Sequence, residues 1–170
     1  IIAALKEAVA VSPKNAARQV RLGKALLGSG LAGEARKAFR YAIAAEPQNM
    51  AAHLEIGEIF LAQNMDHDAE ELFSAISQNN PRDVHVYNRL GIAYRKQGKL
   101  REAIAEYEKA LQVDPEDENL HYNLGRAYLQ AARIEDAKAQ FEKALELKPQ
   151  FPEVLEILRE IEAKQAGQAG

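Results

Sequence analysis

The sequence has no cysteine and no tryptophan among its 170 residues. The absence of cysteine excludes disulfide bonds, thiolate zinc sites, iron–sulfur clusters and cysteine nucleophiles. It is compatible with both the cytosol and the periplasm, and of the two we favour a cytoplasmic location for a soluble protein. No uninterrupted apolar run approaches the roughly 18 residues of a membrane-spanning helix, so we expect no membrane insertion.

A surplus of charge of one sign is also missing. The chain has 22 basic and 25 acidic side chains, for a net charge of −3, and 47% of its residues are hydrophobic. This hydrophobic content is typical of a folded protein. The net charge is too small to indicate a nucleic-acid partner or a membrane surface, and neither is expected.

Proline is scarce but regularly placed. The first five of the six prolines are 34 residues apart, and glycine, alanine and aromatic residues recur at the same spacing. The four series are Pro13, Pro47, Pro81, Pro115 and Pro149; Gly23, Gly57, Gly91 and Gly125; Ala35, Ala69, Ala103 and Ala137; and Phe39, Phe73, Tyr107 and Phe141. A fixed period of this length predicts an array of structural repeats.

Each period has the pattern of two amphipathic helices. In residues 84–98, Val86, Leu90 and Tyr94 share one helical face, and residues 99–113 repeat the pattern. Gly98 supplies a positive-φ position between the helices, and Pro115 ends the second one. A glycine inside a helix costs about 1 kcal/mol, so the recurring glycines indicate that a neighbouring helix needs the room. We expect the recurring ring to fill the space between one helix pair and the next.

These residues resemble a known family. In order, the third period carries Tyr87, Leu90, Gly91, Tyr94, Ala103, Tyr107, Ala110 and Pro115. This order resembles the tetratricopeptide repeat, a 34-residue helix–turn–helix unit of protein-interaction superhelices. The resemblance implies an all-α fold, a right-handed superhelix (α-solenoid) of antiparallel helix pairs.

The phase of this repeat predicts the organisation of the chain. Full repeats are expected at 16–49, 50–83, 84–117 and 118–151. Residues 1–15 are expected to be the second helix of a truncated N-terminal repeat, 152–166 a C-terminal capping helix and 167–170 a tail. Because the chain starts in second-helix phase and without methionine, we interpret it as a segment of a longer protein.

Some positions depart from the family pattern. The large residue usual at the fourth position of a repeat is replaced by Gln19, His53 and His121, and Ile76 replaces a small alanine. We expect these changes to loosen individual interfaces without changing the fold.

No motif indicates catalysis. Residues 28–33 formally match the dinucleotide-binding fingerprint, but a helix precedes them and no strand follows, so we interpret them as a helix-connecting turn. No two of the four histidines have the spacing that places two metal ligands on one helical face. No serine lies in a nucleophile motif. We therefore expect no enzymatic activity, no cofactor and no bound metal.

The resemblance also implies a binding surface, because in this family the first helices line a concave groove. Carried over position by position, it predicts that a peptide contacts Arg21, Lys24, Leu54, Glu55, Glu58, Asn88, Arg89, Arg95, Lys96, Asn119, Tyr122, Asn123 and Arg126. An apolar floor would be formed by Leu54, Leu61, Ala51 and Ala62. Asn88 and Asn123 would bond a peptide backbone, and Tyr122 would point from outside the core toward the groove.

The charge of this predicted groove differs from that of the chain. Six of its side chains are basic and two are acidic, a net charge of +4 against −3 for the whole sequence. The excess predicts an acidic or carboxylate-ended partner segment, which arginine can hold with two parallel hydrogen bonds. The alternative is that these charges only keep the helices soluble.

A more specialised version of this surface is not expected. Chaperone-binding members of the family hold a terminal carboxylate with a fixed set of lysine, asparagine and arginine residues. At the matching positions this sequence has Val20, Lys24, Glu55, His85 and Arg89, of which only Arg89 fits. Starting one repeat later gives no match at all.

The sequence therefore predicts a non-enzymatic protein–protein interaction module that binds an extended or helical segment of another protein in a locally basic groove. Two alternatives remain open. The array is a structural scaffold that self-associates, or it is the recruitment domain of a larger signalling or enzymatic protein.

Overall fold

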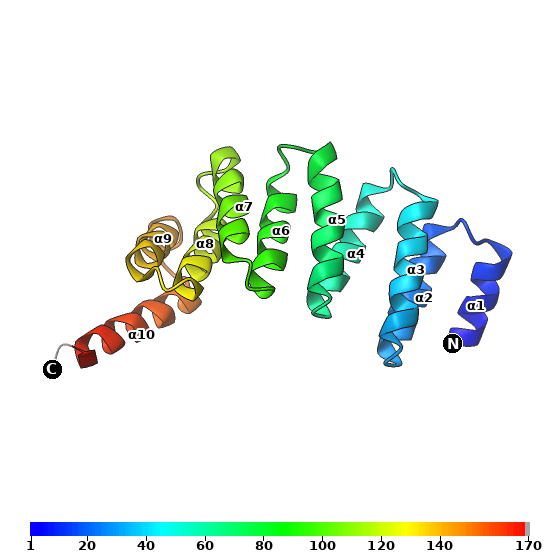
Figure 1. Ribbon diagram of the computed structural model, residues 1–170, viewed down its shortest axis with the longest axis horizontal. Helices are drawn as coiled ribbons and strands as arrows, with labels where there is room; N and C mark the ends of the chain where they lie inside the picture. Colours follow the sequence, from blue (N-terminus) through cyan, green and yellow to red (C-terminus); the bar gives the residue numbers. More distant parts are fainter. Residues whose placement is uncertain (169–170) are drawn as a thin grey trace. The chain divides into compact units, whose positions relative to one another are not determined.

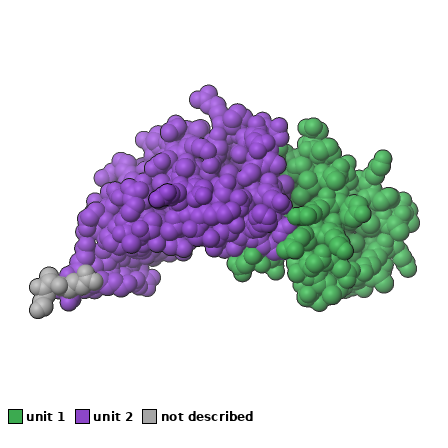
Figure 2. Space-filling view, in the orientation of Figure 1, with its two compact units in different colours: residues 1–64 green, residues 65–170 purple. Residues whose placement is uncertain are grey.

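The computed structural model describes residues 1–168. The chain forms two compact units, Ile1–Asn64 and Met65–Gly170, which are coloured separately in Figure 2. The division falls inside the expected repeat 50–83, between its two helices. Each unit is described by itself below.

The described residues form ten α-helices and no strand, so the prediction of an all-α fold is confirmed (Figure 1). The first unit contains α1 (Ile2–Val11), α2 (Ala16–Gly28), α3 (Ala32–Ala45) and α4 (Met50–Ala62). The second unit contains α5 (Asp66–Asn79), α6 (Val84–Lys96), α7 (Leu100–Val113), α8 (Glu118–Gln130), α9 (Ile134–Leu147) and α10 (Pro152–Gln168).

The first helices of successive periods begin with the same local signal. Each is preceded by Asn15, Asn49, Asp83 or Asp117, whose side chain accepts a backbone N–H bond from the first turn. These bonds satisfy donors that have no partner inside a helix, an effect worth about 1 kcal/mol. Each capping residue lies two positions after a recurring proline, so the end of one period also starts the next.

The helix pairs pack through a glycine and a ring. A Cβ atom built on Gly91 would lie 2.6 Å from Cε1 of Tyr107, and one on Gly125 would lie 2.7 Å from Cε1 of Phe141. The pair α2 and α3 makes the same contact, in which Gly23 faces a ring. The inference that the recurring glycines make room for a neighbour is therefore confirmed.

The expected position of the ring needs a correction. Phe39, Tyr107 and Phe141 lie on the glycine of their own helix pair rather than only between pairs. Phe39 also reaches the next pair, because its ring meets that of Phe60 edge-on at a centroid distance of 5.6 Å. One side chain thus joins both interfaces, and it is completely buried.

The fourth-position side chains that depart from the family pattern are buried and partly bonded. The amide nitrogen of Gln19 lies 3.4 Å from the carbonyl oxygen of Pro13, and Nε2 of His121 lies 3.0 Å from that of Pro115. The hydroxyl of Tyr87 bonds the equivalent Pro81 carbonyl. Gln19, Tyr87 and His121 therefore bond the turn that precedes their own helix.

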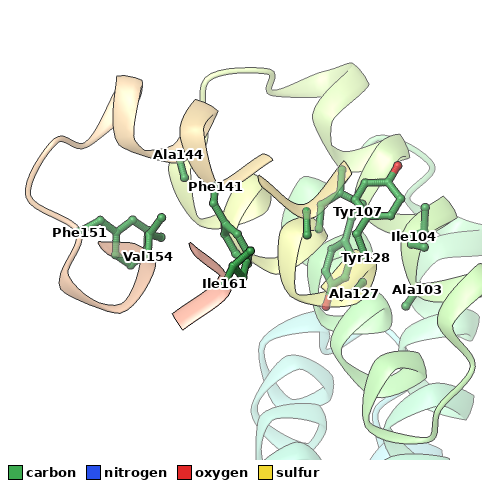
Figure 3. Packing of buried hydrophobic residues seen from close by; sticks show 12 residues of the cluster. Ala103, Ile104, Tyr107, Ala127, Tyr128, Phe141, Ala144, Phe151, Val154 and Ile161 are labelled. Atoms are coloured by element: carbon green, nitrogen blue, oxygen red, sulfur yellow. The ribbon is translucent and has the colours of Figure 1, made fainter. Parts of the chain in front are cut away.

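The last helix covers the end of the second unit. Phe151, Val154 and Ile161 are buried in one hydrophobic cluster with Tyr107, Tyr128 and Phe141 (Figure 3). The helix ends at Gln168, beyond the expected limit of 166, so the expected tail at 167–170 starts too early. Residues 169–170 lie outside the described residues.

The turn between the two helices of a pair uses a left-handed backbone position. Gly30 and Gly98 occupy it with φ of 76° and 75°, and Asn64 and Ala132 occupy it with φ of 55° and 58°. Residues 28–33 thus form the end of α2, this turn and the start of α3, as expected. Ala132 is the residue least suited to the position, because a Cβ atom strains the left-handed region.

We expect Gly91→Ala to destabilise the protein. The new methyl group meets the buried Tyr107 ring, and overpacking of about 1–3 kcal/mol outweighs the roughly 1 kcal/mol gained in helix propensity. Gly33→Ala is the control, because a Cβ atom at Gly33 in α3 meets nothing within 4 Å. Urea unfolding followed by circular dichroism measures both. A midpoint for Gly91→Ala at or above that of Gly33→Ala contradicts the packing argument.

We expect Ala132→Gly to raise the free energy of unfolding by about 1 kcal/mol, because glycine relieves the strain of a positive φ. Ala131→Gly tests the specificity of this effect. Ala131 is next in the chain but has φ of −81°, so glycine there should lower stability. Thermal unfolding measures the midpoint of each variant against that of the unsubstituted protein. The prediction is contradicted if both midpoints shift in the same direction.

Candidate peptide-binding surface

The expected binding residues lie on the first helices of the pairs. In the first unit these helices are α2 and α4, and in the second unit they are α6 and α8. Within each unit the two first helices are neighbours, and predicted residues meet across them. We call the exposed sides of α6 and α8 the first-helix surface of the second unit.

In the first unit, the predicted charges neutralise one another. Nζ of Lys24 on α2 lies 2.5 Å from Oε1 of Glu55 on α4, with both side chains about half exposed. Such exposed pairs contribute at most about 1 kcal/mol, but they remove one positive and one negative charge from the count. Arg21 is exposed. Of the expected apolar floor, Leu61 is buried, Leu54 is half-buried, and Ala51 and Ala62 are exposed.

In the second unit, two predicted asparagines bond each other. Nδ2 of Asn123 on α8 donates to Oδ1 of Asn88 on α6 over 2.9 Å. The bond uses one donor and one acceptor, and leaves the Asn88 amide group and the Asn123 carbonyl oxygen with further bonding capacity. Asn119 lies apart from them, exposed in the first turn of α8 beside Glu118.

Three arginines gather around one buried hydroxyl. Arg89 and Arg95 on α6 and Arg126 on α8 are the positive charges that act on the Tyr107 hydroxyl, and we call them the arginine cluster. Burial raises the pKa of Tyr107 to about 12, although these guanidinium charges act in the opposite direction. The sequence analysis did not predict that the Tyr107 hydroxyl lies near arginine side chains. The only indication in the sequence is that Tyr107 stands where the other periods have Phe39, Phe73 and Phe141.

Lys96 has a partner outside the predicted surface. Its Nζ lies 3.3 Å from Oδ1 of Asp66, which belongs to α5. The basic charge of α6 that faces the predicted surface is therefore carried by arginine rather than lysine. Arginine is the better suited of the two to hold a carboxylate, because its donors form a planar fork.

The helical phase predicted that Tyr122 points from the surface toward the groove, but its ring is partly packed against other residues. Its ring packs on Phe151 at 5.1 Å and on Phe141 at 6.3 Å between centroids. Arg126 lies over the same ring, 5.5 Å from its centroid, and Nη1 is 3.5 Å from the tyrosine hydroxyl. The half-buried ring thus orients a member of the arginine cluster.

Two open pockets adjoin this surface. One of about 220 Å³ is lined by Arg95, Arg126, Leu129, Gln130 and Ile157. The next, of about 420 Å³, shares Leu129 and Ile157 with it and is mainly aliphatic. A larger open pocket of about 670 Å³ lies at Asn79–His85, the connection from α5 to α6, away from the arginine cluster.

Within residues 1–168, no three histidine, aspartate or glutamate side chains come together in a way that could hold a metal ion. Over the same residues, no helix combines the length and the apolar character needed to cross a bilayer.

Comparison with known families identifies the repeat. Tetratricopeptide repeat models match residues 20–84 and 118–151, and a further TPR repeat model matches residues 91–132. The chain belongs to the tetratricopeptide repeat family. No curated protein matches it significantly in sequence.

Solved structures share the fold. MamA 41-end from Desulfovibrio magneticus RS-1 is 25% identical, with a TM-score of 0.69 over 87% of this chain and 84% of that one. YrrB, described as a TPR protein with an unusual peptide-binding site, is 20% identical, with a TM-score of 0.75 over 93% of this chain and 81% of its own. The prediction of an α-solenoid is confirmed.

We expect Tyr107 to titrate at a pKa of about 12. Unfolded tyrosine has a pKa of about 10, so the folded protein keeps a proton that the unfolded chain releases between the two values. The free energy of unfolding should therefore fall by about 3 kcal/mol as the pH rises through this window, and Tyr107→Phe should remove that part of the fall. Phenolate absorbance and urea unfolding measure both quantities. If both proteins show the same phenolate titration above pH of about 10, the buried hydroxyl has been misassigned.

Proposed function

We propose that the chain is a non-enzymatic protein-interaction module and that the first-helix surface of its second unit binds an acidic segment of a partner. The observation that carries this proposal is that Arg95 on α6 and Arg126 on α8, two neighbouring helices, line the same pocket. Family membership supports the general role, and YrrB, a protein of the same fold, has a peptide-binding site. The fold alone does not choose the partner, so the choice rests on these side chains.

The distribution of charge favours the second unit over the first. Lys24 is paired with Glu55 on the first unit's surface, and a partner would have to break that pair to use either charge. Arg95 and Arg126 have no carboxylate partner within residues 1–168. The basic character that the sequence assigns to the whole groove is therefore concentrated on α6 and α8.

An extended peptide also finds backbone partners on this surface. Asn88 and Asn123 lie between the two helices and keep a donor and an acceptor after bonding each other. A peptide backbone offers both kinds of group along its length. We infer that these amides fix the backbone while the arginines select the charge.

We expect an acidic peptide to bind more tightly than a basic peptide of equal length, and the difference to shrink at high salt. Arg126→Glu should weaken binding of the acidic peptide at least about tenfold, because it removes one charged contact and adds repulsion. Fluorescence anisotropy with labelled peptides measures the affinities, and sedimentation without peptide reports self-association.

Arg101→Glu is the matched control. Arg101 lies exposed on α7, outside the predicted surface, and its substitution changes the net charge by the same amount. If the two substitutions weaken acidic-peptide binding equally, the binding is explained by non-specific attraction to the net charge of the protein. Indifference to peptide charge would reject the proposed basic surface.

A further inference from the structure

The 220 Å³ pocket beside the arginine cluster is lined by two guanidinium groups, and none of its lining residues carries a carboxylate. Nε of Arg95 is buried and has no hydrogen-bond acceptor within the described part of the chain. The largest charge effects on the neighbouring Tyr107 hydroxyl come from the guanidinium groups of Arg95, Arg126 and Arg89. Buried polar atoms in folded proteins are nearly always bonded, so this arrangement calls for an added acceptor.

The hydroxyl is not needed for packing. Phe39 and Phe141 fill the equivalent space against Gly23 and Gly125 with a plain phenyl ring, and both are completely buried. Tyr107 makes the same contact with Gly91 and adds only the oxygen. Burying a hydroxyl is unfavourable unless it finds a partner, and a phenylalanine would avoid this requirement. The oxygen is therefore better explained by the arginines beside it than by the core.

The pocket has a cationic side and an aliphatic side. Arg95 and Arg126 form the first, and Leu129 and Ile157 form the second. The same two aliphatic residues continue into the adjoining pocket of about 420 Å³, where Ile161 extends the apolar lining. An anionic group held by the arginines would therefore have aliphatic side chains directly beside it, in a cavity whose other lining residues are Glu160, Lys164 and Gln165.

We propose that this pocket binds a polypeptide carboxylate together with an aliphatic side chain next to it. The carboxylate accepts hydrogen bonds from Arg95 and Arg126, and the aliphatic side chain packs on Leu129 and Ile157. This assignment rests on the proposed function, because it names the ligand chemistry of the same first-helix surface. The carboxylate comes from an aspartate or glutamate side chain or from a chain terminus, since both offer the same two oxygens.

Arginine and carboxylate fit each other geometrically. The planar guanidinium group presents parallel donors that match the two carboxylate oxygens, and charge-assisted bonds of this kind are about twice as strong as neutral ones. Arg126 is already oriented by the Tyr122 ring at 5.5 Å. Tyr107 lies buried behind Arg95, so it is a positioning residue that orients the guanidinium group and does not touch the ligand.

Short peptides separate the two halves of the site. The probes are acetylated peptides: Gly-Ser-Gly-Ser-Leu with a free carboxylate, its C-terminal amide, and Gly-Ser-Glu-Leu-Gly, Gly-Ser-Gln-Leu-Gly and Gly-Ser-Glu-Ser-Gly as amides. Nitrogen-15 spectra of the full 170-residue chain report where each one binds. We expect the free-acid or the Glu-Leu peptide to shift the amide signals of Arg95, Arg126, Leu129 and Ile157. The Gln-Leu and Glu-Ser peptides should bind about tenfold more weakly.

Three variants test the assigned roles. Arg95→Gln should weaken the carboxylate peptides about tenfold. Tyr107→Phe should weaken them about threefold and leave the affinity for the Gln-Leu peptide unchanged, a difference that a merely structural role would not produce. Arg101→Gln on α7 is the charge-matched control and should change nothing. Because phenylalanine occupies the equivalent position in the other periods, Tyr107→Phe is expected to fold, and circular dichroism checks this.

The outcomes distinguish this inference from the proposed function. Equal binding of the Glu-Leu and Gln-Leu peptides, or no binding of any short peptide, overturns the carboxylate pocket. If a longer acidic peptide still binds the first-helix surface and is indifferent to Arg95→Gln, the proposed function stands and the pocket is wrong. If the longer acidic peptide does not bind either, both are rejected. Comparing the free-acid peptide with the Glu-Leu amide shows whether the pocket prefers the carboxylate of a chain terminus or that of a side chain.

Discussion

The contact between a helical glycine and an aromatic ring is the constraint on which each pair depends. Gly91 faces Tyr107 so closely that a methyl group on the glycine would overlap the ring. The missing side chain lets two helices approach, and the ring then fills the space at their interface. The glycine and the ring recur every 34 residues in the sequence, and the pairs α2–α3, α6–α7 and α8–α9 share this contact.

This packing contact also positions the candidate binding surface. Fixing α7 against α6 places the far end of the Tyr107 ring among Arg95 and Arg126. In the other periods the same ring position ends in a carbon atom. In the proposed site, a single oxygen therefore gives a packing residue a second role beside Arg95, at a position that the glycine contact already fixes. The core contact and the candidate site share one side chain, which explains how a uniform scaffold acquires a local specialisation.

Much of the fold could be read from the sequence because its signals are local. The period, the amphipathic faces and the punctuation by proline and glycine each depend on residues within one helix pair. The candidate site was harder, because counting charges treats every side chain as independent. Lys24 and Glu55 are 31 positions apart and neutralise each other. Tyr122 has a surface phase on α8, yet its ring reaches Phe151 beyond the end of the next helix.

The amino-acid sequence by itself determined the repeat, the helix pairs and which residues lie on the first helices, since backbone propensity and hydrophobic spacing fix these within a few turns. Only the tertiary structure decided which charges are paired and which gather around a buried hydroxyl. The reason is physical: the energy of an ionic group depends on its neighbours within a few ångströms, and here those neighbours come from other helices. The sequence alone therefore showed which positions hold arginine, and only the tertiary structure showed that Arg95 and Arg126 line the same pocket.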